Sequence, residues 1–299
     1  MPALADDVAR AVACGGGTRS WLVPFEASAF PYDREIPGTG QPFLDRQDGD
    51  RVGHTSPRGG VRWQDETYSD RRVLLSVPAR FDPRREPVVI LYFHGNGATL
   101  ERDVCHRQGI PRQVAASGLN AVLVAPQLAV DAPDSSAGWF WQDGFAARFL
   151  AEAAGRLQQL AGVRGIAGAP VILAAYSGGY LPAVYSAEVG QIGDRLAGIV
   201  LLDALFGEVD RYASVLASAR PAFASAYSAS SQGPNARLRT LLAERGIAAG
   251  EGVPAALGPG VTTFIPALAS PHGDFATQAF AADPLKVLLG RFGHRGDGR

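Results

Sequence analysis

A serine, an aspartate and a histidine stand in this sequence where they could act together on a carbonyl carbon. Ser177 lies in the segment Ala-Tyr-Ser-Gly-Gly (175–179), between an apolar run and a segment with helical character. A serine hydroxyl is a poor nucleophile at neutral pH unless a nearby base removes its proton. Because Ser-Gly-Gly is also an ordinary loop sequence, the assignment depends on partners elsewhere in the chain.

The best base is His272, which follows the last predicted strand, residues 261–268. The other histidines have weaker contexts: His54 lies in a loop-rich arm, His94 within a glycine motif, His106 in a predicted helix and His294 in a Gly/Arg-rich tail. A loop histidine beyond a strand is placed to reach a residue at the same end of the sheet.

The acid can be found by elimination among the carboxylates between Ser177 and His272, which are Glu188, Asp194, Asp203, Glu208, Asp210, Glu244 and Glu251. Only Asp203 directly follows a predicted strand, residues 196–202, and residues 211–243 contain no acid. An aspartate there could instead cap a helix or form an ion pair. Asp210 and Glu208 remain alternatives for the acid.

A glycine-rich loop completes the set. The predicted buried strand 88–93 runs into His94-Gly-Asn-Gly97. Glycines let backbone amides approach a developing negative oxygen without obstruction by side chains. The expected donors are the amide of Gly178 and that of Asn96 or Gly97. His94 lies inside this motif and precedes the serine in the chain, so we do not expect it to be the base. The alternative is a plain glycine turn before a helix.

The elements that must position these residues alternate along the chain. Apolar runs predict strands at 73–77, 88–93, 120–125, 171–176, 196–202, 222–227 and 261–268, with helices between most of them. Strands that alternate with helices indicate a mostly parallel sheet covered on both faces.

Together these motifs resemble the α/β-hydrolase superfamily. The serine turn is similar to its nucleophile elbow, written Ala-x-Ser-x-Gly here in place of Gly-x-Ser-x-Gly, and 94–97 resembles its oxyanion loop. The resemblance implies that His94 orients this loop. Ser177, Asp203 and His272 follow the superfamily order of nucleophile, acid and base. The resemblance implies an α/β-hydrolase fold and an acid one strand earlier than is usual, as in some lipase-like members.

The resemblance implies a serine hydrolase that cleaves carboxylic esters through an acyl-enzyme and needs no metal or organic cofactor. Its substrate would be a small-molecule or polymeric ester. Alternatives are a serine peptidase or amidase, a lyase or acyltransferase that uses the same serine, and a binding protein that keeps the fold without activity.

Three residues are expected to line the substrate pocket: Trp139, Tyr176 and Gln127. Trp139 belongs to the trio Trp139-Phe-Trp141, which could equally fasten the start of a helix to the sheet. Only 18 residues separate Asp203 from Ala222, which leaves no room for a large helical cap. An open site favours esters of bulky or extended substrates, unless the N-terminal arm or loop 126–142 forms a lid.

The division expected from composition is a loop-rich arm at 1–70, a hydrolase domain at 71–291 and a flexible tail at 292–299. The arm's scattered aromatics are expected to anchor it to the core. The formal net charge of −1 and the lack of an arginine cluster argue against nucleic acid as a partner.

No run reaches transmembrane length and no signal peptide is visible, which favours the cytoplasm, or the periplasm or exterior if a leader was removed. The two cysteines, Cys14 and Cys105, show neither metal-ligand spacing nor a disulfide framework and are expected to be free thiols. The oligomeric state has no signal in the sequence.

Overall fold

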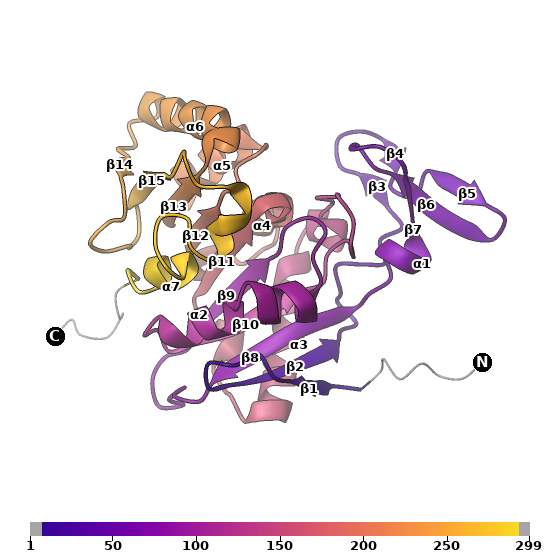
Figure 1. Cartoon of the computed structure of the whole chain (residues 1–299), viewed down its shortest axis with the longest axis horizontal. Helices are drawn as coiled ribbons and strands as arrows, with labels where there is room; N and C mark the ends of the chain where they lie inside the picture. Colours follow the sequence, from indigo (N-terminus) through magenta and orange to yellow (C-terminus); the bar gives the residue numbers. More distant parts are fainter. Residues whose placement is uncertain (1–7, 293–299) are drawn as a thin grey trace.

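A ten-stranded sheet forms the centre of the computed structural model, which describes residues 8–292 (Figure 1). Across the sheet the strands are β1 (Arg10–Val12), β2 (Thr18–Pro24), β8 (Arg72–Pro78), β10 (Ala121–Pro126), β9 (Val88–Phe93), β11 (Val171–Tyr176), β12 (Leu196–Leu202), β13 (Ala222–Tyr227), β15 (Thr262–Pro266) and β14 (Gly250–Glu251). From β10 to β14 all neighbours are parallel, whereas β8 pairs antiparallel with both β2 and β10. The seven strands predicted from apolar runs are all present.

Helices cover both faces of the sheet. Because alternate residues of each strand point to opposite sides, each inner strand contributes side chains to two buried clusters. In β9, Val89, Leu91 and Phe93 enter one buried cluster, and Ile90 and Tyr92 enter the other. The first cluster also contains residues of α3 (Phe145–Ala161), α4 (Tyr180–Glu188), α5 (Val209–Ser218) and α6 (Gln232–Glu244). The second contains residues of α2 (Ile110–Ala116), α7 (Pro284–Leu289) and the π-helical segment η1 (Leu100–Arg107).

The expected N-terminal arm consists of two different parts. Its first part, β1 and β2, extends the central sheet through the antiparallel pairing of β2 with β8. The predicted boundary at residue 71 therefore does not separate two structural units, because part of residues 1–70 is built into the sheet.

The second part of the arm forms two small sheets that lie beside the main one (Figure 1). They contain β3 (Glu35–Ile36) with β4 (Gln41–Pro42), and β5 (Arg46–Asp48), β6 (Arg51–Thr55) and β7 (Val61–Trp63), followed by α1 (Gln64–Thr67). Aromatic side chains attach it to the core: the rings of Phe25 and Phe149 lie 5.3 Å apart, and those of Tyr32 and Trp139 lie 5.5 Å apart. This is the anchoring role that we expected for the aromatics of the arm.

Phe292, the first residue of the predicted tail, belongs to the core. It is buried and pairs with Leu257 in an isolated parallel bridge. The remainder of the predicted tail lies outside the described residues, as does His294.

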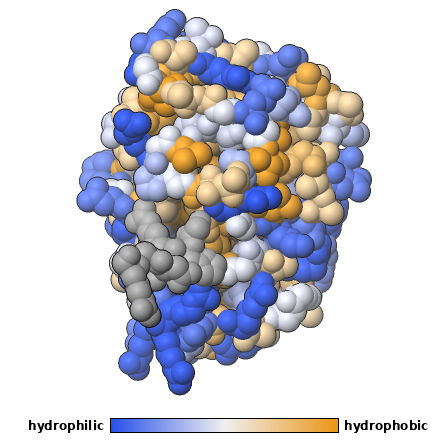
Figure 2. All heavy atoms as spheres, turned by 90° about the vertical axis from the view of Figure 1, so that its left-hand side faces the viewer, coloured by the Kyte–Doolittle hydropathy of each residue, from blue (hydrophilic) through white to orange (hydrophobic). Residues whose placement is uncertain are grey.

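The surface that carries α6 and α7 mixes hydrophobic and hydrophilic residues (Figure 2). Across the described residues, the exposed large apolar side chains include Val253, Val261 and Leu268. No helix within residues 8–292 is long and apolar enough to cross a membrane.

Candidate active site

The turn that presents Ser177 connects β11 to α4 through a single 3-10 turn, η4 (Ser177–Gly179). Ser177 has a φ of 52°, a left-handed conformation that costs a residue with a side chain on the order of 1 kcal/mol or more. Close backbone packing requires glycine beside it: a Cβ at position 179 would lie 2.3 Å from the carbonyl oxygen of Phe93. Strand, turn and helix therefore expose the serine at the carboxyl edge of the sheet.

His272 joins the serine to the aspartate. It begins η7 (His272–Ala276), in the loop after β15. Its Nε2 lies 2.8 Å from Ser177 Oγ, and its Nδ1 lies 2.7 Å from Asp203 Oδ2. The geometry is that of a histidine whose Nδ1–H donates to a carboxylate while Nε2 accepts from a hydroxyl.

Asp203 follows β12 directly and is fully buried. Besides His272, its carboxylate accepts hydrogen bonds from the Ser228 N–H at 2.9 Å, from Ser228 Oγ at 2.7 Å and from Ser231 Oγ. Burial raises the pKa of Asp203, but these hydrogen bonds outweigh burial and lower the pKa below its ordinary value. Asp203 is therefore held as a carboxylate.

The two alternative acids are occupied elsewhere. Glu208 pairs with Arg211 at 2.9 Å, and Asp210 pairs with Arg237 at 2.6 Å. The structure thus brings Asp203 to His272, one strand before the position that is usual for the superfamily, as the sequence predicted.

Aromatic rings fix the orientation of His272. The Tyr176 ring stacks on the imidazole at a centroid distance of 5.2 Å, and the Tyr176 hydroxyl donates to the His272 carbonyl at 3.2 Å. Phe206 contacts the imidazole edge-on at 5.7 Å. Tyr176 is buried and packs against the imidazole, so it positions His272, whereas we expected it to contact substrate.

The glycine loop after β9 lies against the serine turn. A Cβ added to Gly95 would lie 2.8 Å from Ser177 Cβ, and one added to Gly178 would lie 2.0 Å from Asn96 Oδ1. The N–H of Gly97 donates to the Ala132 carbonyl at 2.8 Å, which removes it as an oxyanion donor. Of the two expected donors in this loop, the structure leaves Asn96.

The Asn96 side chain is held from the neighbouring loop. Its Oδ1 accepts a hydrogen bond of 3.1 Å from Ser135 Oγ, while its Nδ2 is buried without a partner among the described residues. A buried unpaired donor is unfavourable, and Nδ2 can still donate to a water or to another group. Nothing in the sequence indicated that Ser135 would lie beside Asn96.

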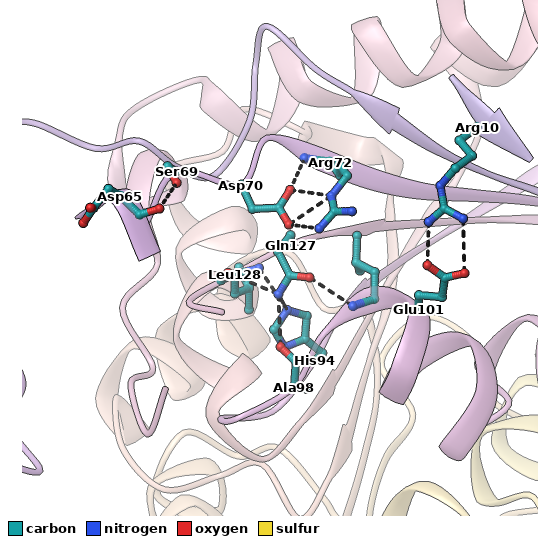
Figure 3. A network of polar contacts seen from close by, with 11 residues as sticks. Arg10, Asp65, Ser69, Asp70, Arg72, His94, Ala98, Glu101, Gln127 and Leu128 are labelled. Carbon is teal, nitrogen blue, oxygen red and sulfur yellow. Dashed lines mark hydrogen bonds and ion pairs between the residues drawn. The ribbon is translucent and has the colours of Figure 1, made fainter. Parts of the chain in front are cut away.

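His94 and Gln127 hold this loop in place through hydrogen bonds (Figure 3). His94 Nε2 accepts hydrogen bonds from the Leu128 N–H at 2.9 Å and from Gln127 Nε2 at 3.0 Å, and its Nδ1–H donates to the Gly95 carbonyl at 2.8 Å. Burial lowers the pKa of His94, which keeps the ring neutral. The predicted role of His94 in orienting the loop agrees with these contacts.

Gln127 is not a pocket residue, contrary to our expectation. Its side chain is buried, its Oε1 accepts from the Leu100 N–H at 3.0 Å, and its Nε2 donates to the Ala98 carbonyl at 3.1 Å (Figure 3). Its hydrogen bonds thus fix His94 and the segment that follows the glycine loop.

Trp139 anchors the arm. It lies in η2 (Gly138–Trp141), where its Nε1–H donates to the Pro31 carbonyl at 2.6 Å and its ring packs against Tyr32. These contacts are structural, but they join Trp139 to the arm, whereas the structural alternative we expected was to fasten the start of a helix to the sheet.

The two cysteines form a disulfide, so the prediction of free thiols was wrong. Cys14 and Cys105 lie 91 residues apart in the chain with their Cα atoms 4.9 Å apart, and both are buried. The bond ties the end of β1 to η1, the segment that begins three residues after Gly97. Pairing at this separation requires the folded sheet and leaves no local signal in the sequence.

The comparisons with known proteins agree with this geometry at the level of the fold. No protein-family model and no curated protein sequence matches the chain. The structure is similar to an S-formylglutathione hydrolase from Agrobacterium tumefaciens, with a TM-score of 0.50 at 11% identity over 95% of this chain and 99% of that one.

Two further solved structures are similar at lower TM-scores. An S-formylglutathione hydrolase from Staphylococcus aureus gives a TM-score of 0.43 at 14% identity, over 72% of this chain and 86% of that one. An esterase from Rhizomucor miehei gives 0.48 at 12% identity, over 83% and 81%. By its strand order, its serine turn and its similarity over nearly the full chain to the Agrobacterium enzyme, this protein is an α/β-hydrolase in fold.

Proposed function

We propose that this protein is a serine hydrolase that cleaves carboxylic esters through an acyl-enzyme intermediate. The observation that carries the proposal is the bridging position of His272, 2.8 Å from the Ser177 hydroxyl and 2.7 Å from the Asp203 carboxylate. The esterase and S-formylglutathione hydrolase structures that share the fold support the same class of reaction.

In the first step, Ser177 Oγ attacks the ester carbonyl carbon while His272 Nε2 takes the hydroxyl proton. Asp203 fixes the imidazole tautomer and stabilises the imidazolium that forms. The carbonyl oxygen becomes an oxyanion, which the N–H groups of Gly178 and Asn96 stabilise by roughly 3 kcal/mol per donor.

The tetrahedral intermediate then collapses. The bond from carbon to the leaving oxygen breaks, and His272 Nε2 returns its proton to that oxygen, so that the alcohol leaves. Water attacks the acyl-enzyme with His272 again as the base. The acid product leaves, and the Ser177 hydroxyl is restored. No step in this scheme calls for a metal or an organic cofactor.

The test is covalent labelling with a fluorophosphonate, located by peptide mass spectrometry. We expect the label on Ser177 in the wild-type protein and none in Ser177→Ala. Ser214→Ala, which alters an exposed serine of α5, is the control and should be labelled like the wild type. An unlabelled, folded wild-type protein would refute the proposal and favour a binding protein that retains the fold.

Ester and amide substrates differ in the leaving group that His272 must protonate. We propose esters as the substrates, and a matched pair of p-nitrophenyl acetate and p-nitroacetanilide tests this. Each kcat/KM is divided by the rate of hydroxide-catalysed hydrolysis of that substrate, and a greater enhancement for the amide than for the ester would instead identify a peptidase or amidase.

The lack of a helical cap between β12 and β13 supports the proposal that the substrates are bulky or extended esters. Between β12 and β13 the chain contains a single helix, α5, so no helical cap is inserted there. We expect activity on p-nitrophenyl esters over a broad range of acyl lengths. A sharp preference for acetate would contradict this.

We propose that the protein works in an oxidising compartment. The buried Cys14–Cys105 disulfide supports this, because cytosolic reductants keep most protein thiols reduced. Because both cysteines are buried, cells are lysed directly into denaturant that contains iodoacetamide, and mass spectrometry should find both cysteines unmodified. Alkylated cysteines would place the protein among reduced cytoplasmic proteins.

A further inference from the structure

A groove of about 580 Å³ lies beside the active site, and the mechanism above does not use it. Residues 206–211, which comprise the end of the loop after Asp203 and the first turn of α5, form one side of it, and Gly233, Pro234 and Arg237 of α6 form the other. The groove is therefore formed by the two segments that follow β12 and β13 at the carboxyl edge of the sheet. In parallel sheets, ligands bind at this edge.

The groove adjoins the base directly. Phe206, which lines it, contacts the His272 imidazole edge-on at a centroid distance of 5.7 Å. The next lining residue, Gly207, approaches the Tyr180 hydroxyl, since a Cβ at Gly207 would lie 3.2 Å from that oxygen. Tyr180 is the first residue of α4, three positions after Ser177.

The groove lies next to His272, and this position determines which part of a substrate the groove would hold. His272 Nε2 delivers the proton to the leaving oxygen, so the leaving group must lie on the side of the imidazole. A groove that begins at the Phe206 ring is placed to hold the alcohol portion of the ester.

The charged residues that line the groove indicate which kind of alcohol it can bind. Glu208 and Asp210 contribute two carboxylates, and Arg211 and Arg237 contribute two guanidinium groups, so the formal charges cancel. The Arg237–Asp210 pair, at 2.6 Å, is solvent-exposed on both side chains, 61% and 67%. Such a pair presents donors and acceptors side by side, which suits hydroxyl groups because each hydroxyl both donates and accepts.

We propose that this groove is the leaving-group subsite and that it takes a neutral, polyhydroxylated alcohol, such as a glycerol or sugar unit. The apolar surface of Phe206, Val209 and Pro234 packs against the carbon skeleton, while the four charged side chains bind the hydroxyls. This inference rests on the proposed ester hydrolysis and adds the class of alcohol.

The test compares two acetate esters whose leaving alcohols share a three-carbon skeleton and differ in their hydroxyl groups: 1-acetylglycerol and propyl acetate. The value of kcat/KM for each is divided by its rate of hydroxide-catalysed hydrolysis. The wild-type protein should favour 1-acetylglycerol by about tenfold, as expected for one or two additional hydrogen bonds.

A variant that fills the groove provides the second arm. Gly233 lines the groove, and a Cβ added there meets nothing within 4 Å, so Gly233→Trp introduces bulk without a backbone clash. Gly155→Trp is the matched control, because Gly155 is also an exposed helical glycine with open space at its Cβ, in α3. Gly233→Trp should bring the ratio of the two substrates close to one, and Gly155→Trp should keep the wild-type ratio.

Arg237→Met separates hydrogen bonding from added bulk, because it removes the donors and keeps an unbranched, flexible side chain that is shorter than the native one. It should lower the preference for 1-acetylglycerol by raising KM more than it lowers kcat. A wild-type ratio of one, or a ratio that Gly233→Trp leaves unchanged while propyl acetate is hydrolysed, would overturn the subsite alone. Absence of both hydrolysis and Ser177 labelling would overturn the proposed function together with it.

Discussion

Ser228 donates both its backbone N–H and its hydroxyl to the carboxylate of Asp203, at 2.9 Å and 2.7 Å. The two residues stand directly after neighbouring strands, β12 and β13, at the same edge of the sheet. Ser228 therefore occupies the position from which most α/β-hydrolases supply their acid, while Asp203 reaches His272 from the adjacent strand.

This relationship predicts that the acid can be moved from one strand to the other. Asp203→Ser should lower kcat/KM by roughly 10³-fold or more, because the imidazole loses the group that orients it. Adding Ser228→Asp should recover about tenfold or more of the lost kcat/KM, since the side chain at position 228 already lies within hydrogen-bonding distance of the native carboxylate. Ester hydrolysis by the single and double variants provides the measurement. No recovery in a folded double variant would show that the β13 position cannot reach His272.

Ser135 is expected to position Asn96. Ser135→Ala removes the 3.1 Å hydrogen bond to Asn96 Oδ1 and should lower kcat by about fivefold with little change in KM, because the oxyanion donor is less well fixed. Ser135→Thr keeps a hydroxyl and should retain most of the activity. Equal losses in the two variants would indicate a packing effect in place of the hydrogen bond.

The lowered pKa of Asp203 predicts a stability change in acid. A carboxyl group with a lower pKa in the folded state than in the unfolded state stabilises the fold fully above the unfolded value, about 3.9, and loses that contribution as the pH falls towards the folded value. Urea unfolding at pH 5 and pH 3 measures the loss. Asp203→Asn should lose less free energy of unfolding over this range than the wild type. An identical loss would assign the effect to other carboxylates.

The disulfide should contribute to stability mainly through the unfolded chain. Closing a loop of 91 residues is expected to stabilise the fold by roughly 4–5 kcal/mol. Urea titrations with and without a reductant should therefore give different midpoints for the wild type. The double variant Cys14→Ser/Cys105→Ser should unfold at the lower midpoint in both conditions, and a reductant effect that persists in it would contradict the assignment.

The sequence predicted most of what lies in the middle of the sheet. Strands such as β11 and β12 are buried on both faces, so they read as continuous apolar runs, and the residues that follow them fall at one edge by topology alone. Asp203 was found because residues 211–243 lack an acid. Ser177 and Asp203 could be singled out because each directly follows a strand, and His272 because it lies in the loop after the last one.

Contacts between distant segments could not be predicted in the same way. The Cys14–Cys105 bond and the contact of Trp139 with Pro31 join the arm to the core, and each depends on how the arm folds back. Gln127 was misjudged because a polar residue after a strand can face the pocket or the loop beneath it. Only the packed structure distinguishes these orientations.

The ends of the sheet have a consequence for how copies of this protein meet. The outermost strands, β1 with three residues and β14 with two, are the shortest of the ten. A short edge offers few free backbone groups to an incoming strand from another molecule. The sheet is thus protected against edge-to-edge aggregation, although its inner strands are among the most apolar segments of the chain.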